Sequence, residues 1–292
     1  MDLNSPTLNE LLDLWLKEDI GRGDLTSIVV GEGTSSAHWI AKQKGVFCSG
    51  PIIKRLFARL HQSVKIELLI KDGESFKSGQ KLLNLTGPKS VLLSGERTAL
   101  NLAMHLSGIA TATAKLVAEL DDSSIKLVDT RKTTPGLRLL EKYAVKCGGG
   151  INHRMGLDDA AMLKENHIAW SAGITQSIKV LRKSIPWPAR IIVEAETENQ
   201  AKDAVNAGAD GVLLDEMSLA KIIELVPRLR ELAAKPSQDR MSSQIVIEIS
   251  GINPTEINKY ASSGVDLIST SAPITKSSWI DFSMRFNDNT NK

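Results

Sequence analysis

The sequence predicts an α/β protein with two domains, a small sheet domain with helices and then a parallel sheet or barrel. Its 292 residues are long enough for two moderate domains. From Ala37 to Ser94, short runs rich in β-forming residues alternate with turn residues. From about residue 113, short apolar strands alternate with helices, which favours a parallel sheet.

The chain opens with a predicted amphipathic helix. Four apolar residues recur at helical spacing: Leu8, Leu11, Leu12 and Trp15. Gly21 predicts its end.

Within the first domain, Lys65–Ile70 and Lys81–Thr86 read as strands. The charge-free run Thr98–Ala114 predicts a buried or interface helix, because it is too polar for a bilayer span.

The second domain contains six candidate strands, at residues 125–129, 161–164, 191–194, 211–215, 245–248 and 267–269. A helix is predicted over Glu198–Ala207. Another is predicted after Asn253, with Pro254 in its first turn.

Polar residues stand at one end of nearly every candidate strand. They are Asp129 to Lys132, Lys164, Glu194, Asp215, Glu248 with Ser250, and Ser269 to Ser271. In a parallel barrel the carboxyl ends of the strands share one face, which predicts a single polar pocket. The alternative is that polar residues simply begin where strands end.

Cations dominate the densest cluster of these residues: Arg131, Lys132, His153, Arg154 and Lys164. A pocket lined with them favours a ligand carrying several carboxylates or phosphates. The alternative is a solvated basic surface loop. Pro135-Gly136 and Gly148-Gly149-Gly150 instead suggest a backbone shaped for close approach.

Two acids, Glu194 and Asp215, close neighbouring strands and form a candidate Mg²⁺ site that would bridge a pyrophosphate. They could equally balance the neighbouring cations. Ser250-Gly251 and the Ser269–Ala272 run could bind phosphate at helix starts, although such residues are more often helix caps.

The composition favours an ordinary globular protein. Hydrophobic residues make up 42% and charged residues 24% of the chain, with a net charge of +2, which does not favour nucleic acid or a membrane as partner. Cys48 and Cys147 suggest no disulfide framework, and the first residues do not resemble a signal peptide. Both facts favour a cytoplasmic location.

Several segments resemble the nicotinate-nucleotide pyrophosphorylase (carboxylating) family, the quinolinate phosphoribosyltransferases. They are Glu18–Thr26, Gly95–Asn101, Asp129–Gly136, Lys146–Arg154, Lys164–His167, Leu213–Met217 and Gly264–Ser269. The likeness covers nearly the whole chain, and the Asp-Thr-Arg-Lys-Thr-Thr-Pro-Gly run is its most specific motif.

The resemblance implies an N-terminal α/β sandwich domain over residues 1–112 and an incomplete, seven-stranded-type α/β barrel over 113–275, with 276–292 packing back on the first domain. It implies phosphoribosyl transfer from phosphoribosyl pyrophosphate to quinolinate with decarboxylation, in NAD biosynthesis. It also implies Mg²⁺ as cofactor and a homodimer in which Arg97 reaches the partner's site.

The resemblance assigns roles by residue. Arg97, Arg131, Lys132, His153, Arg154 and Lys164 would bind the carboxylates and phosphates of the substrates. Ser250, Gly251 and Ser271 would hold the 5-phosphate. Glu194 and Asp215 would contact the ribose and Mg²⁺, and with Lys132 they form the expected catalytic set. The chain departs from the family pattern at Glu165, often Asp, and at Lys276, often His.

Three alternatives remain open at this point. A related enzyme could accept another aromatic substrate, although Arg131, His153 and Arg154 together favour a dicarboxylate. A non-catalytic sensor of phosphorylated sugars would need only the phosphate loops, and retention of both acids speaks against it. A carrier domain over Asp72–Gly87 lacks an exposed lysine at its hairpin tip.

Overall fold

The computed structural model describes residues 5–120, 124–235 and 244–286. The chain divides into two compact units. Unit 1 comprises residues 1–114, 134–149 and 276–292, and unit 2 comprises residues 115–133 and 150–275. The sequence-based boundary had assigned residues 134–149 to the barrel domain, whereas here they cluster with unit 1. Of the segment expected to pack back on the first domain, 287–292 lie outside the described residues.

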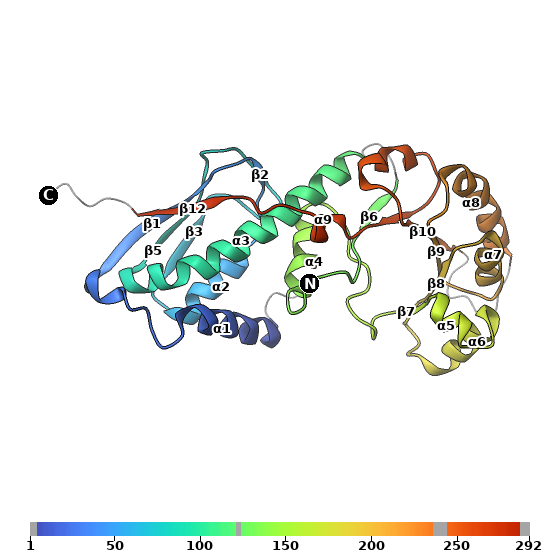
Figure 1. Ribbon diagram of the computed structural model, residues 1–292, viewed down its shortest axis with the longest axis horizontal. Coiled ribbons are helices and arrows are strands. Elements are labelled where there is room, and N and C mark those ends of the chain that lie inside the picture. The colour runs from blue at the N-terminus through green and yellow to red at the C-terminus, as the bar shows by residue number, and fades with distance from the viewer. Residues whose placement is uncertain (1–4, 121–123, 236–243, 287–292) are drawn as a thin grey trace. The chain divides into compact units, whose positions relative to one another are not determined.

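The sheet of unit 1 is antiparallel and follows the order β12-β1-β5-β3 (Figure 1). Its strands are β1 (Thr34–Ala41), β3 (Lys65–Leu68), β5 (Lys81–Pro88) and β12 (Phe282–Phe286). Two short strands, β2 (Gly45–Val46) and β4 (Ser75–Phe76), form a separate pair. Strand β12, from near the end of the chain, thus lies beside β1.

In the part of unit 1 that the structure describes there are four α-helices: α1 (Pro6–Ile20), α2 (Gly50–Leu60), α3 (Lys89–Ala118, which runs on into unit 2) and α4 (Arg138–Cys147). A 3₁₀ turn covers Ser27–Val29. The expected opening helix is α1, with Gly21 at its C-cap. Small residues let the helices approach closely, since a Cβ on Gly95 of α3 would lie 2.6 Å from the Phe57 ring of α2.

One buried carboxylate ties α4 to α3. Glu141 of α4 has no exposed side-chain surface. Its Oε1 accepts a 2.9 Å hydrogen bond from Nε2 of His105 on α3, and its Oε2 accepts one of 2.9 Å from the Thr134 amide. This carboxylate therefore fixes the segment 134–149 inside unit 1.

Unit 2 is built on a parallel sheet in the order β6-β11-β10-β9-β8-β7, with its helices along the outer side (Figure 1). The strands are β6 (Lys126–Val128), β7 (Ala161–Leu163), β8 (Ile191–Ala195), β9 (Gly211–Asp215), β10 (Val246–Ser250) and β11 (Leu267–Ser269). Ile151 adds a single parallel bridge to Val128, at the place of a seventh strand. In the described residues no pairing joins this end to β7, so the barrel is incomplete, as predicted.

The helices of unit 2 are α5 (Glu165–Ala169), α6 (Ile174–Ser184), α7 (Glu198–Asn206), α8 (Leu219–Ala234) and α9 (Ala272–Thr275), with a 3₁₀ helix η2 at Pro254–Tyr260. Side-chain hydrogen bonds cap the first turns of two of these helices, α7 and η2. Thr197 and Gln200 form a reciprocal capping box on α7, and the Asn253 side chain accepts from the Thr255 amide at η2.

Strand alternation divides unit 2 into an apolar outer layer and an inner face on which polar residues stand beside apolar ones such as Ile192 and Val246. Ile191, Val193, Ile247 and Ile249 belong to the buried core shared with the helices. Glu194, Asp215, Glu248 and Ser250 occupy the alternate positions, on the opposite face of the strands. No helix among the described residues is both long and apolar enough to cross a membrane.

Candidate functional site

The carboxyl ends of β9 and β10 bring two predicted site residues together. Asp215 and Ser250 are directly paired in the parallel register, and the Ser250 hydroxyl donates a hydrogen bond to Asp215 Oδ1. The predicted phosphate-binding serine and the predicted metal-binding acid are therefore neighbours.

Lys164 and Glu194 form the second contact at this edge. Lys164 follows β7 directly, and its Nζ lies 2.5 Å from Glu194 Oε2. The Lys164 side chain keeps 46% of its surface exposed, against 16% for Glu194. The ion pair holds the carboxylate in place and leaves the lysine reachable by a ligand.

Two arginines of unit 2, Arg131 and Arg154, lie close enough for their positive charges to repel one another. Burial, and next the positive charge of Arg131, lower the pKa of Arg154 from its usual value. Nη1 of Arg154 donates to the Ala160 carbonyl at 2.9 Å. Nε of Arg131 is buried and has no hydrogen-bond partner among the described residues. Two neighbouring guanidinium groups, one with an unmet donor, favour an anionic ligand.

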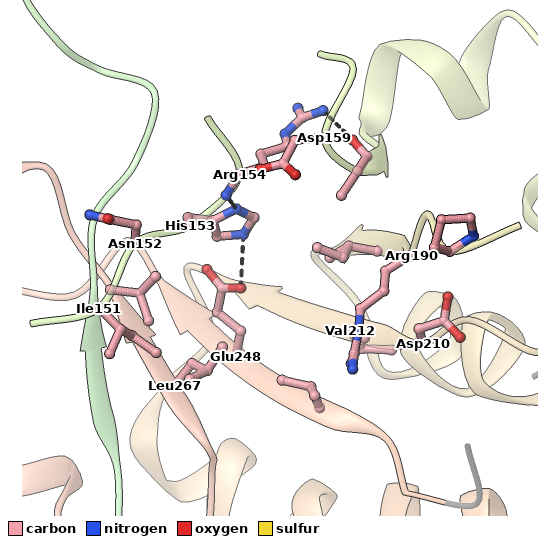
Figure 2. Close-up of a pocket in the computed structure, with 16 residues that line it drawn as sticks. Ile151, Asn152, His153, Arg154, Asp159, Arg190, Asp210, Val212, Glu248 and Leu267 are labelled. Carbon is pink, nitrogen blue, oxygen red and sulfur yellow. Dashed lines mark hydrogen bonds and ion pairs between the residues drawn. The ribbon is translucent and has the colours of Figure 1, made fainter. Parts of the chain in front are cut away.

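His153 is held on both ring nitrogens (Figure 2). Nδ1 accepts a 2.7 Å hydrogen bond from the Arg154 amide, which leaves the proton on Nε2, 3.3 Å from Glu248 Oε2. The His153 amide donates to Asp129 Oδ1 at 2.9 Å. Asp129 also accepts from Asn152 Nδ2 at 2.6 Å, so the turn that carries His153 and Arg154 is anchored to the end of β6.

Glu248 was predicted only as one of the polar residues at the strand ends, with no role in the site. It is only 3% exposed, and its second oxygen, Oε1, is buried without a hydrogen-bond partner in the described part of the chain. The sequence carried a signal for it, since an acid two residues before Ser250 falls on the same face of the strand as Ser250.

A cavity of about 360 Å³ lies beside His153 (Figure 2). His153, Arg154 and Glu248 bound it on one side, and Arg190 and Asp210 on the other. Of the predicted site residues, only His153 and Arg154 line it.

The remaining predicted residues lie in three settings. Lys132 is exposed on the segment after β6, with its amide bonded to Thr130 Oγ1 at 3.0 Å. Ser271 precedes α9, whose last residue, Thr275, donates its amide proton to the Ser271 carbonyl. Arg97 belongs to unit 1, where it is exposed on α3.

Gly251 has a structural reason to be glycine. Its φ is +73°, and a Cβ there would lie 2.7 Å from Cγ of Glu216. This explains the residue through backbone shape and packing and does not test a role in phosphate binding. The departures from the family pattern, Glu165 and Lys276, are both exposed.

Two family models match the chain, and together they cover most of it. The N-terminal domain of quinolinate phosphoribosyl transferase matches residues 24–107, and the C-terminal domain matches residues 109–285. The chain belongs to the quinolinate phosphoribosyltransferase family.

Several relatives of this family are named as carboxylating nicotinate-nucleotide pyrophosphorylases. The chain is 41% identical to the probable enzyme of Synechocystis over 276 residues, 94% of this chain and 90% of the relative. It is 48% identical over 214 residues to that of Bacillus subtilis, with 73% and 74% covered. The human enzyme is 32% identical over 283 residues, with 96% and 91% covered.

Solved structures of the same family share the fold. The nicotinate-nucleotide pyrophosphorylase of Francisella tularensis has a TM-score of 0.89 at 32% identity, covering 98% of both chains. NadC from Streptococcus pyogenes has a TM-score of 0.89 at 35% identity, covering 99% of this chain and 100% of that one. The predictions of family, α/β fold and enzyme class are therefore confirmed for this member of the family. The roles of individual site residues stay predictions.

Proposed function

We propose that the protein transfers a phosphoribosyl group from phosphoribosyl pyrophosphate to quinolinate, with loss of one carboxylate. The products are nicotinate mononucleotide, pyrophosphate and CO₂. The proposal rests on membership of the family, whose relatives are named for this carboxylating activity. The predicted cytoplasmic location rests on composition and stays a prediction.

One observation in the site supports this substrate most directly, the pair formed by Arg131 and Arg154. Their mutual repulsion is relieved by a ligand that brings two negative charges to one place. A pyridine dicarboxylate does so, and each guanidinium can bind one carboxylate. A monocarboxylate would leave one arginine unpaired.

Glu194 and Asp215 are the candidate holders of Mg²⁺. Both offer the hard carboxylate oxygens that Mg²⁺ prefers, and Mg²⁺ is usually bound by one or two carboxylates together with substrate phosphates. In the structure Glu194 is paired with Lys164, and Asp215 accepts from Ser250, so each retains further oxygen lone pairs. The donor set fits the ion, which when bound would neutralise charge on the departing pyrophosphate.

The chain's own side chains then have distinct tasks in the transfer. Arg131 and Arg154 orient the pyridine ring so that its nitrogen faces the anomeric carbon. Positive charge develops at that carbon as pyrophosphate departs, and the nearby carboxylates stabilise it. Lys132 and Lys164 bind the phosphate oxygens. Once the ring nitrogen is alkylated, its positive charge stabilises the carbanion left on the adjacent ring carbon as CO₂ departs, and a proton from water then takes the place of the carboxylate.

We further propose that the enzyme acts as a homodimer, with Arg97 supplied by the neighbouring subunit. Its support is that Arg97 is exposed on α3 in unit 1, while the other proposed ligands belong to unit 2. The family resemblance assigns it to the partner's site.

The test is an assay with phosphoribosyl pyrophosphate, Mg²⁺ and either quinolinate or nicotinate, monitored by chromatography. We expect nicotinate mononucleotide and CO₂ in equal amounts from quinolinate. Nicotinate should be used far less well, because an unpaired cation in the site costs roughly 2–5 kcal/mol. Equal turnover of the two acids would contradict the dicarboxylate site. Binding of both substrates with no product would instead support a sensor.

A further inference from the structure

The two cysteines of the chain, distant in sequence, meet in unit 1. Cys48 stands just before α2, and Cys147 is the last residue of α4. Their Sγ atoms and one carboxylate oxygen of Asp72 all lie within 4.8 Å of one another. None of these residues belongs to the site proposed above.

The two thiols have unequal surroundings. Cys48 is fully buried, its amide donates to Ser107 Oγ at 3.1 Å, and its carbonyl accepts from the same hydroxyl at 3.2 Å. Burial raises the pKa of Cys48 well above its usual value. Cys147 is partly exposed, and a hydrogen bond from Cys48 lowers its pKa. Cys147 is therefore the more accessible and the more acidic of the two thiols, and the buried Cys48 lies beside it.

Asp72 holds the backbone segments that carry both thiols. It accepts from the Ser49 and Gly50 amides, at 3.1 and 2.8 Å, and from the Tyr143 hydroxyl, at 2.7 Å. Ser49, next to Cys48, has a φ of 137°, a strained value that the surrounding contacts maintain. The start of α2 is thus fixed against α4.

The same cluster is a poor closed metal site. Among the described residues it offers three candidate ligands, whereas structural thiolate sites take four. Three hydrogen bonds already occupy the Asp72 carboxylate. The geometry favours chemistry between the two sulfur atoms.

We propose that Cys147 and Cys48 form a redox-active dithiol that exchanges with low-molecular-weight disulfides such as oxidised glutathione. The Cys147 thiolate attacks one sulfur of the solute disulfide, forming a mixed disulfide and releasing one thiolate. Cys48 then attacks Cys147 Sγ, and its proton passes to the second departing thiolate. The two protein thiols are oxidised, and the solute disulfide is reduced to two thiols.

Intact-mass spectrometry of the whole protein after incubation with oxidised glutathione tests the proposal. We expect the native protein to lose about 2 Da as the internal disulfide forms. Cys48→Ser should instead gain about 305 Da, as the mixed disulfide on Cys147 cannot be resolved. The matched variant Cys147→Ser should remain unmodified, because Cys48 is buried.

Three outcomes would overturn the proposal: no mass loss in the native protein, equal reaction of the two variants, or a stoichiometric metal ion that blocks the reaction. If Cys48→Ser does not fold, acid quenching of the native reaction serves instead, and the trapped adduct must map to Cys147. The readout is mass and not turnover, so the result is independent of the proposed transferase activity.

Discussion

At the scale of single residues, the ring of His153 is held by contacts at both of its nitrogen atoms. The Arg154 amide occupies Nδ1, and Glu248 lies 3.3 Å from Nε2. The ring therefore keeps one tautomer and one orientation. We therefore expect Glu248 to be a positioning residue, one that acts on substrate only through His153.

The role of Glu248 predicts a graded pair of variants. Glu248→Gln keeps an oxygen that accepts from His153 Nε2–H, and we expect it to retain most activity. Glu248→Leu removes the acceptor, and kcat/KM for quinolinate should fall about 10- to 100-fold, as expected when one buried hydrogen bond is lost. Steady-state kinetics with each substrate measures this. An equal loss in both variants, with unchanged KM for quinolinate, would show that Glu248 does not act through His153.

The proposed metal role of Asp215 predicts a loss specific to one substrate. Asp215→Asn should reduce kcat/KM for phosphoribosyl pyrophosphate about 100-fold or more, with little change in quinolinate binding. Excess chelator should abolish turnover of the native enzyme, and added Mg²⁺ should restore it. Asp203→Asn, on the exposed face of α7, is the matched control. Full activity in chelator would exclude the metal role.

The sequence was informative about the site wherever a polar residue followed a strand. Asp215 and Ser250 were predicted separately, and strand register brings them into contact. The sequence could not show that the Glu248 carboxylate contacts the His153 ring. That contact joins a strand to a distant loop, and it depends on the path of the loop between β6 and β7.

At the scale of elements, a buried carboxylate, Glu141, links α4 to α3 and to Thr134. Burial alone would raise the pKa of Glu141, but hydrogen bonds from His105 and Thr134 outweigh it and hold the pKa below its usual value. A carboxylate with a lowered folded pKa stabilises the protein above the unfolded value. That contribution is lost as pH falls through the folded pKa.

We therefore expect Glu141→Gln to lower the free energy of unfolding by about 1–3 kcal/mol at pH 7. The difference in unfolding free energy between native protein and variant should narrow as pH falls through the lowered pKa of Glu141. Urea unfolding at several pH values measures it, with Glu10→Gln on the exposed surface of α1 as control. A gap that stays constant through the acid range would assign the loss to packing alone.

Elements with strong local signals were predicted closely. β9 and β11 have their predicted bounds, since short apolar runs end there at polar residues. β10 ends two residues later than predicted, because its pairing with β9 continues to Ser250. The approach of Cys48 to Cys147 left no local signal. It depends on how α2 and α4 pack, which no sequence window contains.

At the scale of the whole molecule, the shared-site proposal predicts complementation. Arg97→Ala and Lys132→Ala should each be nearly inactive alone. When they are unfolded and refolded together, half the dimers are mixed, and each mixed dimer has one intact site. Activity should then recover to about a quarter of wild type if the sites act independently. Each variant refolded alone is the control. If mixed dimers are confirmed but show no activity, the shared-site proposal is contradicted. Arg97 would then act only within its own helix.

Unit 1 is assembled from three separate stretches of the chain, and this affects how it is made in the cell. Its β1 pairs with β5 early, but its other edge waits for β12, near the far end of the sequence. Until the ribosome has released residue 286, β1 presents unpaired backbone groups, which can pair with another nascent chain. Most of unit 2, residues 150–275, lies between the second and third of these stretches, so the time taken to synthesise it sets how long that edge stays open.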